Sequence, residues 1–361
     1  MEPFKNIFDK EAVSQIAFFL EKSSYEFNKE SFIKDASMGL KQLELKDRVR
    51  HISLAMKANL PGPYRKNIQI IKKSVGEEKI NKFLIWPLTQ YIEDEGLDDL
   101  KTSLSAMKEL TKYFTSEFCI RPFLDRYQDD VYQVLKNWAM DKNHHIRRLC
   151  SEGIRPNLPW GMKSHFVINN LEKGIQILEL LKNDESEYVR KSVANHMNDI
   201  SRIDEKLFLK TIKRWNRESK EKNMQKLIRH ASRTLLKKGH PEVLKVHGYK
   251  KDLNIKIKAS SLTPKKIKEG DYLNLSLHIK INETKPHPVL VDYIIHFKKL
   301  KGHSPIVFRL KDTLIKEDLT IDKKIHFKKV TTRKHYPGKH FLEIQVNGKS
   351  YLKKEFYLNE A

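Results

Sequence analysis

Asp141-Lys-Asn-His-His-Ile-Arg-Arg-Leu-Cys-Ser-Glu-Gly-Ile-Arg-Pro-Asn-Leu-Pro-Trp160 is the stretch that decides the fold, because its frame returns later in the chain. The second copy is Asp184-Glu-Ser-Glu-Tyr-Val-Arg-Lys-Ser-Val-Ala-Asn-His-Met-Asn-Asp199, at an offset of 43 residues. In this alignment Ile146-Arg147-Arg148 corresponds to Val189-Arg190-Lys191. A period of this length is typical of HEAT-type repeats, helix pairs that bury their apolar faces only by stacking on neighbours. The period therefore predicts a helical solenoid.

Helical patterning extends on both sides of these two copies. Residues 207–236 form a third unit, in which Leu227-Ile228-Arg229 follows the Val189-Arg190 pair by about 39 residues. Nearer the N-terminus, apolar residues recur at three-to-four spacing, as in Val13-Ile16-Ala17-Leu20. Helix breakers separate such runs at Pro61-Gly-Pro63, Pro87, Gly96, Pro122, Pro156, Pro159 and Gly239-His-Pro241. The first 245 residues are therefore expected to be helical throughout.

After Gly248 the pattern changes to alternation of apolar and polar residues. It is seen in Leu273-Asn-Leu-Ser-Leu-His-Ile279, in Val289-Leu-Val-Asp-Tyr-Ile-Ile-His-Phe297 and in His340-Phe-Leu-Glu-Ile-Gln-Val346. Turn residues separate these runs, among them the hairpin pair Asn347-Gly348. About seven short strands in such a segment match an immunoglobulin-like sandwich. We predict an all-α HEAT-like solenoid over residues 1–247 and an all-β immunoglobulin-like sandwich over residues 248–361.

The positive charge is concentrated in one part of the chain. The formal net charge is +24; residues 1–200 carry 31 Lys and Arg against 29 Asp and Glu, whereas residues 201–350 carry 37 against 15. A localised excess of this kind is typical of a polyanion-binding surface. It favours nucleic acid as the partner over a membrane surface or a lysine-biased composition, since no amphipathic anchor helix is evident. Lysines continue through the sandwich at Lys323-Lys324, Lys328-Lys329 and Arg333-Lys334.

The compartment and the cofactor requirement are also constrained. The sequence has no run of 18 apolar residues and no signal-peptide core, and its two cysteines, Cys119 and Cys150, make no disulfide framework. A protein of a reducing cytoplasm, acting as a monomer without an obligate protein partner or a membrane, is expected. Gly348-Lys-Ser350 lacks the upstream glycine of a phosphate-binding loop, and the 15 histidines include no metal-binding spacing. We therefore expect no cofactor and no metal, and a buried thiol at Cys150.

Two carboxylates occupy surroundings that are unusual for surface acids. Glu117 is flanked by aromatic and apolar residues, and Glu152 lies among Arg147, Arg148 and Arg155. On a DNA-facing surface an acid repels phosphate, so its presence needs a reason. One reason is a salt bridge to an arginine of the next repeat; the other is stabilisation of a cation near the DNA.

Four long motifs carry a resemblance to a known family. Glu117 with Ile120-Arg-Pro-Phe-Leu124, the run from Arg147 to Trp160, Tyr188-Val-Arg-Lys-Ser-Val-Ala-Asn-His-Met-Asn-Asp-Ile200, and Arg229-His-Ala-Ser-Arg-Thr-Leu-Leu-Lys-Lys-Gly-His-Pro241 resemble the AlkC family. These are bacterial DNA alkylation-repair glycosylases of the HEAT-like superfamily that also contains AlkD. The similarity runs from about residue 4 to residue 245, and the sandwich resembles the immunoglobulin-like domain of a family subset.

The resemblance implies a reaction and a set of site residues. The family removes 3-methyladenine and 3-methylcytosine from duplex DNA without flipping the base, unlike most glycosylases. By motif match, Glu117 and Glu152 would be the catalytic carboxylates and Trp160 the aromatic wall beside the lesion. Basic side chains of the same surface are the candidates for DNA-backbone contacts: Arg148, Arg155, Arg190, Lys191, Arg229, Arg233, Lys237 and Lys238. Arg190 has a competing role, pairing with an acid of the adjacent repeat.

Three rival functions remain open at this stage. The first is a scaffold that binds damaged DNA without cleaving it, which could have lost Glu117, Glu152 or Trp160. The second is a protein-interaction solenoid, which the positive charge disfavours. The third is a glycosylase with narrower specificity for bulky or cationic N3 and N7 adducts.

Overall fold

The structure is a computed structural model that describes residues 3–75, 82–283, 285–329 and 334–360, so Arg333 lies outside the described residues. The chain folds into two compact units, residues 1–200 and residues 201–361. The predicted domain division at residue 247 lies at a different place from this boundary and stays a prediction. Within the described residues, no helix is both long and apolar enough to cross a membrane.

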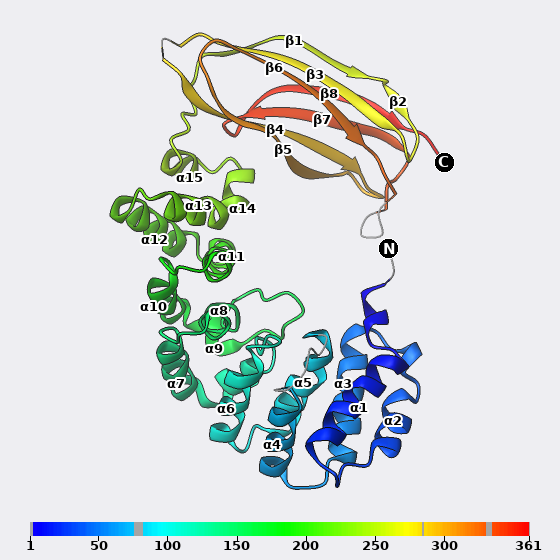
Figure 1. The fold of residues 1–361 in the computed structure, drawn as a ribbon. Helices are drawn as coiled ribbons and strands as arrows, with labels where there is room; N and C mark the ends of the chain where they lie inside the picture. The colour runs from blue at the N-terminus through cyan, green and yellow to red at the C-terminus, as the bar shows by residue number, and fades with distance from the viewer. Residues whose placement is uncertain (1–2, 76–81, 284, 330–333, 361) are drawn as a thin grey trace. The chain divides into compact units, whose positions relative to one another are not determined.

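The first unit is built from helices and short 3-10 turns (Figure 1). Its α-helices are α1 (Lys10–Ser23), α2 (Lys29–Ser37), α3 (Leu45–Asn59), α4 (Tyr64–Ser74), α5 (Trp86–Glu95), α6 (Leu100–Leu110), α7 (Ile120–Trp138), α8 (His144–Glu152), α9 (His165–Asn169), α10 (Leu171–Leu181) and α11 (Glu187–Ile203). The 3-10 turns are η1 (Phe4–Ile7), η2 (Leu40–Gln42) and η3 (Lys82–Ile85). Successive helices pack on one another, and the predicted apolar stripe of α1 is buried. Pro87 and Pro122, expected as breakers, lie in the first turns of α5 and α7, where proline is tolerated.

The 43-residue frame is a structural repeat. α8 begins at His144 and α11 at Glu187, each after a turn in which an aspartate accepts a backbone N–H two residues on: Asp141 from Asn143 at 2.9 Å and Asp184 from Ser186 at 2.8 Å. The same offset therefore produces the same local hydrogen bonds, as the sequence predicted.

The arginines of this frame hold the turns. Arg147 donates to the carbonyls of Asp141 and Lys142, both at 2.9 Å, and Arg190 makes the equivalent bonds to the carbonyls of its own turn. Arg147 also donates through Nε to Asp184 Oδ2 at 2.6 Å and through Nη2 to Oδ1 at 2.9 Å. Such a bidentate pair fixes orientation as well as distance, so Arg147 joins consecutive repeats.

The second unit combines the last helices with the sandwich. The helices are α12 (Glu205–Glu218), α13 (Lys222–Ala231), α14 (Arg233–Lys237) and α15 (Pro241–Val246). The strands are β1 (Ile255–Thr263), β2 (Lys266–Ile267), β3 (Tyr272–Ile281), β4 (His287–Lys298), β5 (His303–Ile315), β6 (Asp318–His326), β7 (Gly338–Val346) and β8 (Lys349–Leu358).

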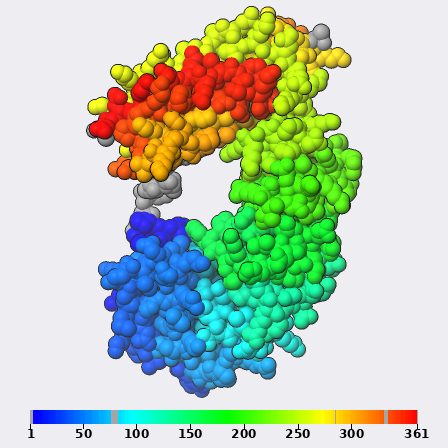
Figure 2. Space-filling model, turned by 180° about the vertical axis from the view of Figure 1, so that it is seen from behind, coloured from blue at the N-terminus to red at the C-terminus, as the bar shows by residue number. Residues whose placement is uncertain are grey.

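The strands form two sheets that enclose an apolar core. One sheet has the order β1-β3-β6 and the other β2-β8-β7-β4-β5, and apart from the parallel β2–β8 pair all neighbours are antiparallel. In Figure 2 the red strands β7 and β8 run together on one face of the sandwich. Core residues alternate along β3 and β7 as predicted, whereas the alternation expected for residues 289–297 is wrong for burial, because β4 lies inside its sheet and is buried continuously from Val289 to Ile295. Asn347 and Gly348 form the predicted hairpin turn, with φ of 47° and 76°.

Two glycines permit a close backbone approach in this unit. A Cβ added to Gly348 would lie 2.7 Å from Gly239 Cα, and the residue has φ +76°. Gly348→Ala is therefore expected to lower the free energy of unfolding by about 2 to 4 kcal/mol, through overpacking and left-handed strain. Gly302→Ala is the matched control, because Gly302 has φ +67° but no heavy atom within 4 Å of a new Cβ. Denaturant unfolding of the two variants measures the difference, and equal losses would contradict the close approach.

Candidate active site

Glu117 lies in the segment between α6 and α7, and its carboxylate is buried, with 7% of the residue exposed. Its Oε2 accepts a hydrogen bond from the Thr115 hydroxyl at 2.7 Å and a charge-assisted bond from Arg148 Nη1. The same Thr115 oxygen accepts from Arg148 Nη1 at 2.9 Å and from the Glu117 backbone N–H at 3.2 Å. Thr115 and Arg148 together therefore fix the position of this carboxylate.

Glu152 is the last residue of α8 and is 4% exposed. Helix dipoles disfavour a carboxylate at a C-terminus, so this charge needs partners. Arg155 Nη1 donates to Oε1 at 2.6 Å, Arg148 Nη2 lies 3.5 Å from the same oxygen, and the Ser192 hydroxyl of α11 donates to Oε2 at 2.6 Å. Partners from both repeats thus hold the carboxylate in place.

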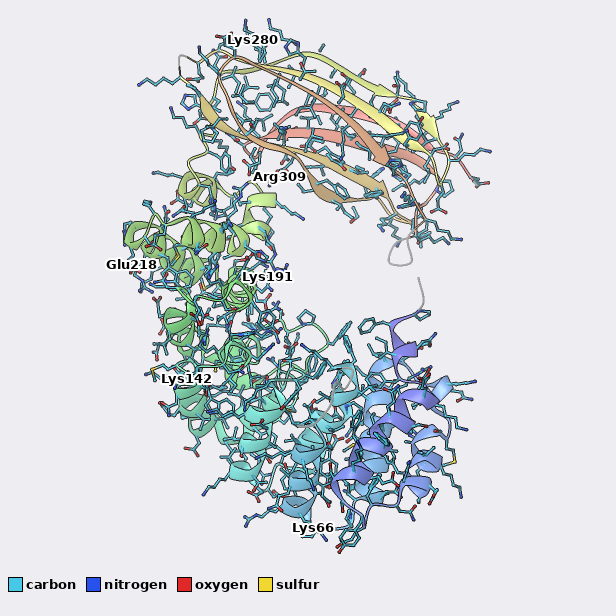
Figure 3. All side chains as sticks on the ribbon, in the orientation of Figure 1. Lys66, Lys142, Lys191, Glu218, Lys280 and Arg309 are labelled. Atoms are coloured by element: carbon cyan, nitrogen blue, oxygen red, sulfur yellow. The ribbon has the colours of Figure 1, made fainter. Side chains whose placement is uncertain are left out.

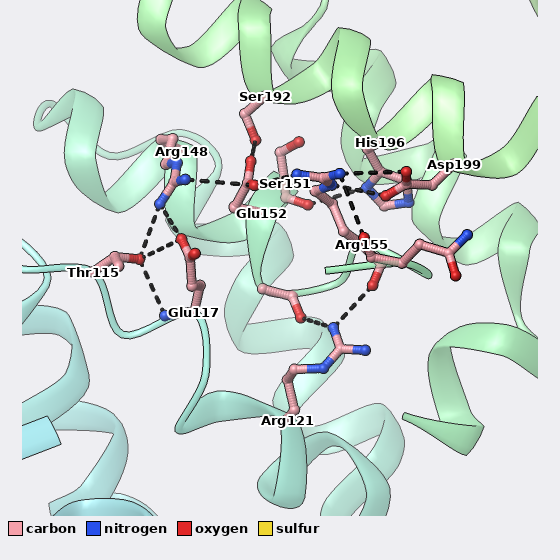
Figure 4. Close-up of polar contacts among 12 residues, drawn as sticks. Thr115, Glu117, Arg121, Arg148, Ser151, Glu152, Arg155, Ser192, His196 and Asp199 are labelled. Atoms are coloured by element: carbon pink, nitrogen blue, oxygen red, sulfur yellow. Dashed lines mark hydrogen bonds and ion pairs between the residues drawn. The ribbon is translucent and has the colours of Figure 1, made fainter. Parts of the chain in front are cut away.

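The two carboxylates belong to one continuous chain of ion pairs (Figure 4). Arg148 joins Glu117 to Glu152, and Arg155 joins Glu152 to Asp199 through Nε–Oδ2 and Nη2–Oδ1 distances of 2.8 and 3.3 Å. Arg121 adds a third guanidinium group, whose charge also acts on Glu117 and Asp199. Buried charges require such compensation, and here arginines supply it to all three carboxylates.

The environments of the two glutamates push their pKa values apart. Burial raises the pKa of Glu117 above its ordinary value, although the Arg148 charge opposes the rise. Burial has the same effect on Glu152, but the charges of Arg148 and Arg155 outweigh it and lower the pKa of that carboxyl. Glu152 is therefore the more firmly ionised group, whereas Glu117 has the greater affinity for a proton.

Trp160 is largely exposed, with 56% of the residue accessible, and its ring centroid lies 6.0 Å from that of Phe4 at an angle of 43°. Its ring stacks on Trp86 at a centroid distance of 6.1 Å and an interplanar angle of 14°, and Trp86 stacks in turn on Phe118 at 5.1 Å. The backbone at Trp160 is left-handed, with φ 63°, and Lys46 Nζ donates to its carbonyl at 2.9 Å. A strained conformation persists only where the surroundings hold it, and strain of this kind concentrates at functional sites.

Arg121 ties the Trp160 loop to the end of α8. Its Nη1 donates to the carbonyls of Gly153 and Arg155 at 2.8 and 2.9 Å, and its Nε donates to the Met162 carbonyl at 2.5 Å. Burial lowers the pKa of this guanidinium to about 10. The carboxylate cluster and the exposed tryptophan are therefore parts of one braced structure.

Several residues of this site had no assigned role in the sequence. They are Thr115, Arg121, Ser192 and Asp199 in the polar network and Trp86 and Phe118 in the aromatic stack. Asp199 is 47 residues after Glu152, which is not the repeat period, so no spacing signal pointed to it. Only the position of Phe118, directly after Glu117, could have suggested the stack.

The predicted DNA-binding residues differ in their exposure and in the groups that they bind. Lys191, labelled in Figure 3, Lys237 and Lys238 have exposed side chains. Arg148 and Arg155 are engaged by the carboxylates. The remaining arginines bind groups of their own unit: Arg190 the carbonyls of residues 184 and 185, Arg233 the His230 carbonyl at 2.9 Å, and Arg229 the Asp312 carboxylate beside Tyr249.

Cys150 and His196, two other groups of this unit that could take part in chemistry, are buried and contact backbone carbonyls. Cys150 is fully buried, its Sγ donates to the Ile146 carbonyl at 3.3 Å, and burial raises the pKa of its thiol. His196 is also buried and its Nδ1 lies 3.0 Å from the Ser151 carbonyl; burial lowers its pKa to about 3. In the part of the chain that the structure describes, no cluster of His, Cys, Asp or Glu could hold a metal ion.

The fold is that of a helical-repeat protein with a C-terminal β-sandwich, and comparison with known families places it in DNA alkylation repair. The family model described as DNA alkylation repair enzyme matches residues 22–236, and the chain belongs to this family. A second model, described as the C-terminal Ig-like domain of the uncharacterised protein YhaZ, matches residues 256–360. The predicted fold class, a HEAT-like solenoid followed by an immunoglobulin-like sandwich, is confirmed.

Two relatives are similar to this chain over nearly its whole length. The solved structure of Pseudomonas fluorescens alkylpurine DNA glycosylase AlkC, bound to DNA containing an abasic site analog, is 34% identical with a TM-score of 0.95, and the match covers 99% of this chain and 100% of that chain. The uncharacterized protein YhaZ of Bacillus subtilis (strain 168) is 35% identical over 352 residues, 96% of this chain and 97% of that protein. The resemblance to AlkC drawn from the sequence motifs is confirmed.

Proposed function

We propose that this protein is a DNA glycosylase that hydrolyses the N-glycosidic bond of cationic N3-alkylated bases, 3-methyladenine and 3-methylcytosine, in duplex DNA without base flipping. The observation that carries the proposal is the pair of buried carboxylates, Glu117 and Glu152, that arginines hold in place in the same unit as the exposed Trp160. Carboxylates fixed in this way can stabilise positive charge that develops on a substrate without reorganising. Family membership and the similarity to AlkC support the same activity.

The substrate chemistry explains why carboxylates suffice. An N3-alkylated base is already cationic and leaves as a neutral molecule, so its departure needs no strong general acid. The bond between C1′ and the base nitrogen breaks with its electron pair on the base, leaving an oxocarbenium-like sugar that a nearby carboxylate stabilises. Water then adds to C1′, and the proton that the water loses passes to a carboxylate. Glu152, the more firmly ionised carboxylate, suits the electrostatic role, and Glu117, with the raised pKa, suits the acceptance of this proton.

The remaining residues supply binding and position. Trp160 would lay its electron-rich face against the cationic lesion, and its exposure supports contact with a base that stays in the duplex. Lys191, Lys237 and Lys238 are the exposed candidates for phosphate contacts, together with Arg190, Arg233 and the lysine-rich sandwich. We assign Arg148 and Arg155 to charge compensation of the carboxylates, and Arg229 to its contact with Asp312. We further propose that the protein acts as a cytoplasmic monomer.

Base release from methylated duplex DNA tests this function. The protein is incubated with duplex DNA that carries N-methylated bases, and the released bases are separated and quantified against the spontaneous background. Release of 3-methyladenine and 3-methylcytosine is expected. Tight binding of the same duplex without release would overturn the proposal and favour a damaged-DNA-binding scaffold, and release confined to N7 or bulky adducts would reassign the substrate.

The loss of rate at acidic pH, the acidic limb of the pH–rate profile, is expected to follow the protonation of Glu117. Because the pKa of Glu117 is raised and that of Glu152 is lowered, Glu117 is the first of the two to become protonated as pH falls. Thr115→Val removes the hydroxyl that donates to the ionised Glu117, so its pKa rises further and the limb moves to higher pH. Single-turnover release across a pH series measures the shift. Ser192→Ala, which removes the matching donor to Glu152, is the control and leaves the limb in place; an equal shift in both variants contradicts the assignment.

A further inference from the structure

A second exposed aromatic residue stands beside the carboxylate cluster. Tyr188 is in the first turn of α11, and 44% of it is exposed. Its ring lies against the guanidinium of Arg148, whose Cζ is 5.2 Å from the ring centroid. Arg148 joins Glu117 to Glu152, so Tyr188 contacts the cation that links these two carboxylates.

Two histidines of α8 fix the orientation of this ring. His145 meets Tyr188 at a centroid distance of 5.6 Å and an angle of 69°, and His144 meets it at 6.1 Å and 89°. Both contacts are edge-to-face, a favourable arrangement for aromatic rings. The ring is thus held with one face toward Arg148, and it is positioned from both repeats.

The electrostatic surroundings place Tyr188 within reach of the cluster. Burial raises the pKa of its phenol, the Arg148 charge opposes the rise, and Glu117 and Glu152 add to it. The phenol therefore remains neutral at physiological pH, and the ring keeps the electron-rich face that attracts a guanidinium.

On the proposed function, a DNA phosphate would compete with the carboxylates for Arg148. Arginine forms strong bidentate pairs with phosphate, and a DNA-binding surface brings phosphates close to every exposed cation. The Arg148 side chain is 15% exposed, so it can reach solvent, and an outward rotation would leave two buried carboxylates without their shared cation. A flat aromatic ring against the guanidinium opposes that rotation.

We propose that Tyr188 is a positioning residue: its ring holds the guanidinium of Arg148 on Glu117 and Glu152 and keeps it away from DNA phosphates. This role rests on the proposed glycosylase function, because only a reaction through the two carboxylates makes the position of Arg148 matter. The alternative role is direct contact of Tyr188 with DNA; in that case loss of the ring would weaken binding without moving Arg148.

Two readouts on Tyr188→Leu test the role. The single-turnover rate of base release at saturating protein is expected to fall about 5- to 20-fold, the range of a partly desolvated cation–π contact. The slope of log K against log salt for duplex DNA is expected to steepen by about 0.9, because the released Arg148 gains one phosphate. Tyr188→Phe keeps the ring and is expected to behave as the wild type in both measurements.

Tyr25→Leu is the control for loss of an exposed aromatic, because Tyr25 is 92% exposed and lies outside the cluster; neither readout is expected to change. A shallower salt slope, or weaker binding with an unchanged saturating rate, would show that Tyr188 contacts DNA itself and would overturn the proposal. An unchanged slope with a lowered melting temperature would reduce Tyr188 to a packing residue. Absence of release by the wild type would refute the glycosylase instead, and the salt slope would still test Tyr188.

Discussion

Glu152→Gln is expected to slow base release from methylated duplex DNA by about 10²- to 10³-fold, the cost of removing one preorganised electrostatic group. The amide keeps the shape of the side chain and can still accept from Ser192, but it carries no negative charge toward the developing sugar cation. Glu117→Gln is expected to lose activity to a similar extent, because it removes the group that accepts the proton from water. Single-turnover release measures both losses, and binding to DNA with an abasic-site analogue measures retention of affinity.

The controls separate a chemical role from a general effect of charge. Glu185→Gln changes an acid whose side chain is 86% exposed and which contacts Arg147 at 3.2 Å, outside the cluster. This variant is expected to keep the wild-type rate. Parallel losses of rate and binding in Glu152→Gln would contradict the role in chemistry and would indicate that the carboxylate holds the fold of the site.

Arg155→Met is expected to lower the free energy of unfolding by about 3 to 5 kcal/mol, the range for breaking a buried ion pair by removal of one partner. The guanidinium is almost fully buried and serves both Glu152 and Asp199, and Asp199 is itself 2% exposed. Methionine has a similar volume, so the loss arises from two carboxylates left with too little positive charge. Denaturant unfolding at neutral pH measures it.

A second substitution makes this prediction specific to charge. Asp199→Asn in the Arg155→Met background removes one of the stranded charges and is expected to recover part of the stability. Stability of Arg155→Met is also expected to improve on mild acidification, because protonation of the stranded carboxylates relieves their burial. A double variant less stable than Arg155→Met would show that packing, and not unpaired charge, dominates at this position.

The sequence predicted the parts of the fold that depend on local pattern. The offset of 43 residues placed the starts of α8 and α11, and the turn hydrogen bonds of Asp141 and Asp184 repeat at that offset. Alternation placed β3, β4 and β7, and Asn347-Gly348 formed the expected hairpin. These features follow from the 3.6-residue and two-residue periods of buried faces and from turn chemistry, which act over short stretches of chain.

For the site, the sequence alone singled out Glu117, Glu152 and Trp160 but could not say what surrounds them. Of the two explanations that remained open for the carboxylates, the structure shows that pairing with arginines is present, and stabilisation of a cation near the DNA stays a proposal. The sequence also could not separate Arg148 and Arg155, which face carboxylates, from Lys191, which faces solvent. The sequence shows that a side chain is positively charged but not which groups surround it.

What the sequence by itself determined is therefore the order of helices and strands, the uneven charge and the presence of acids where DNA-binding surfaces lack them. The tertiary structure decided which charges meet. Arg148 of α8 reaches Glu117, in the segment between α6 and α7, over 31 residues. Arg155, just after α8, reaches Asp199 of α11 over 44 residues. Periodicity fixes which face of a helix is buried, but the partner of a buried charge depends on how neighbouring segments pack. Burial and these partners then move the pKa values of Glu117 and Glu152 in opposite directions.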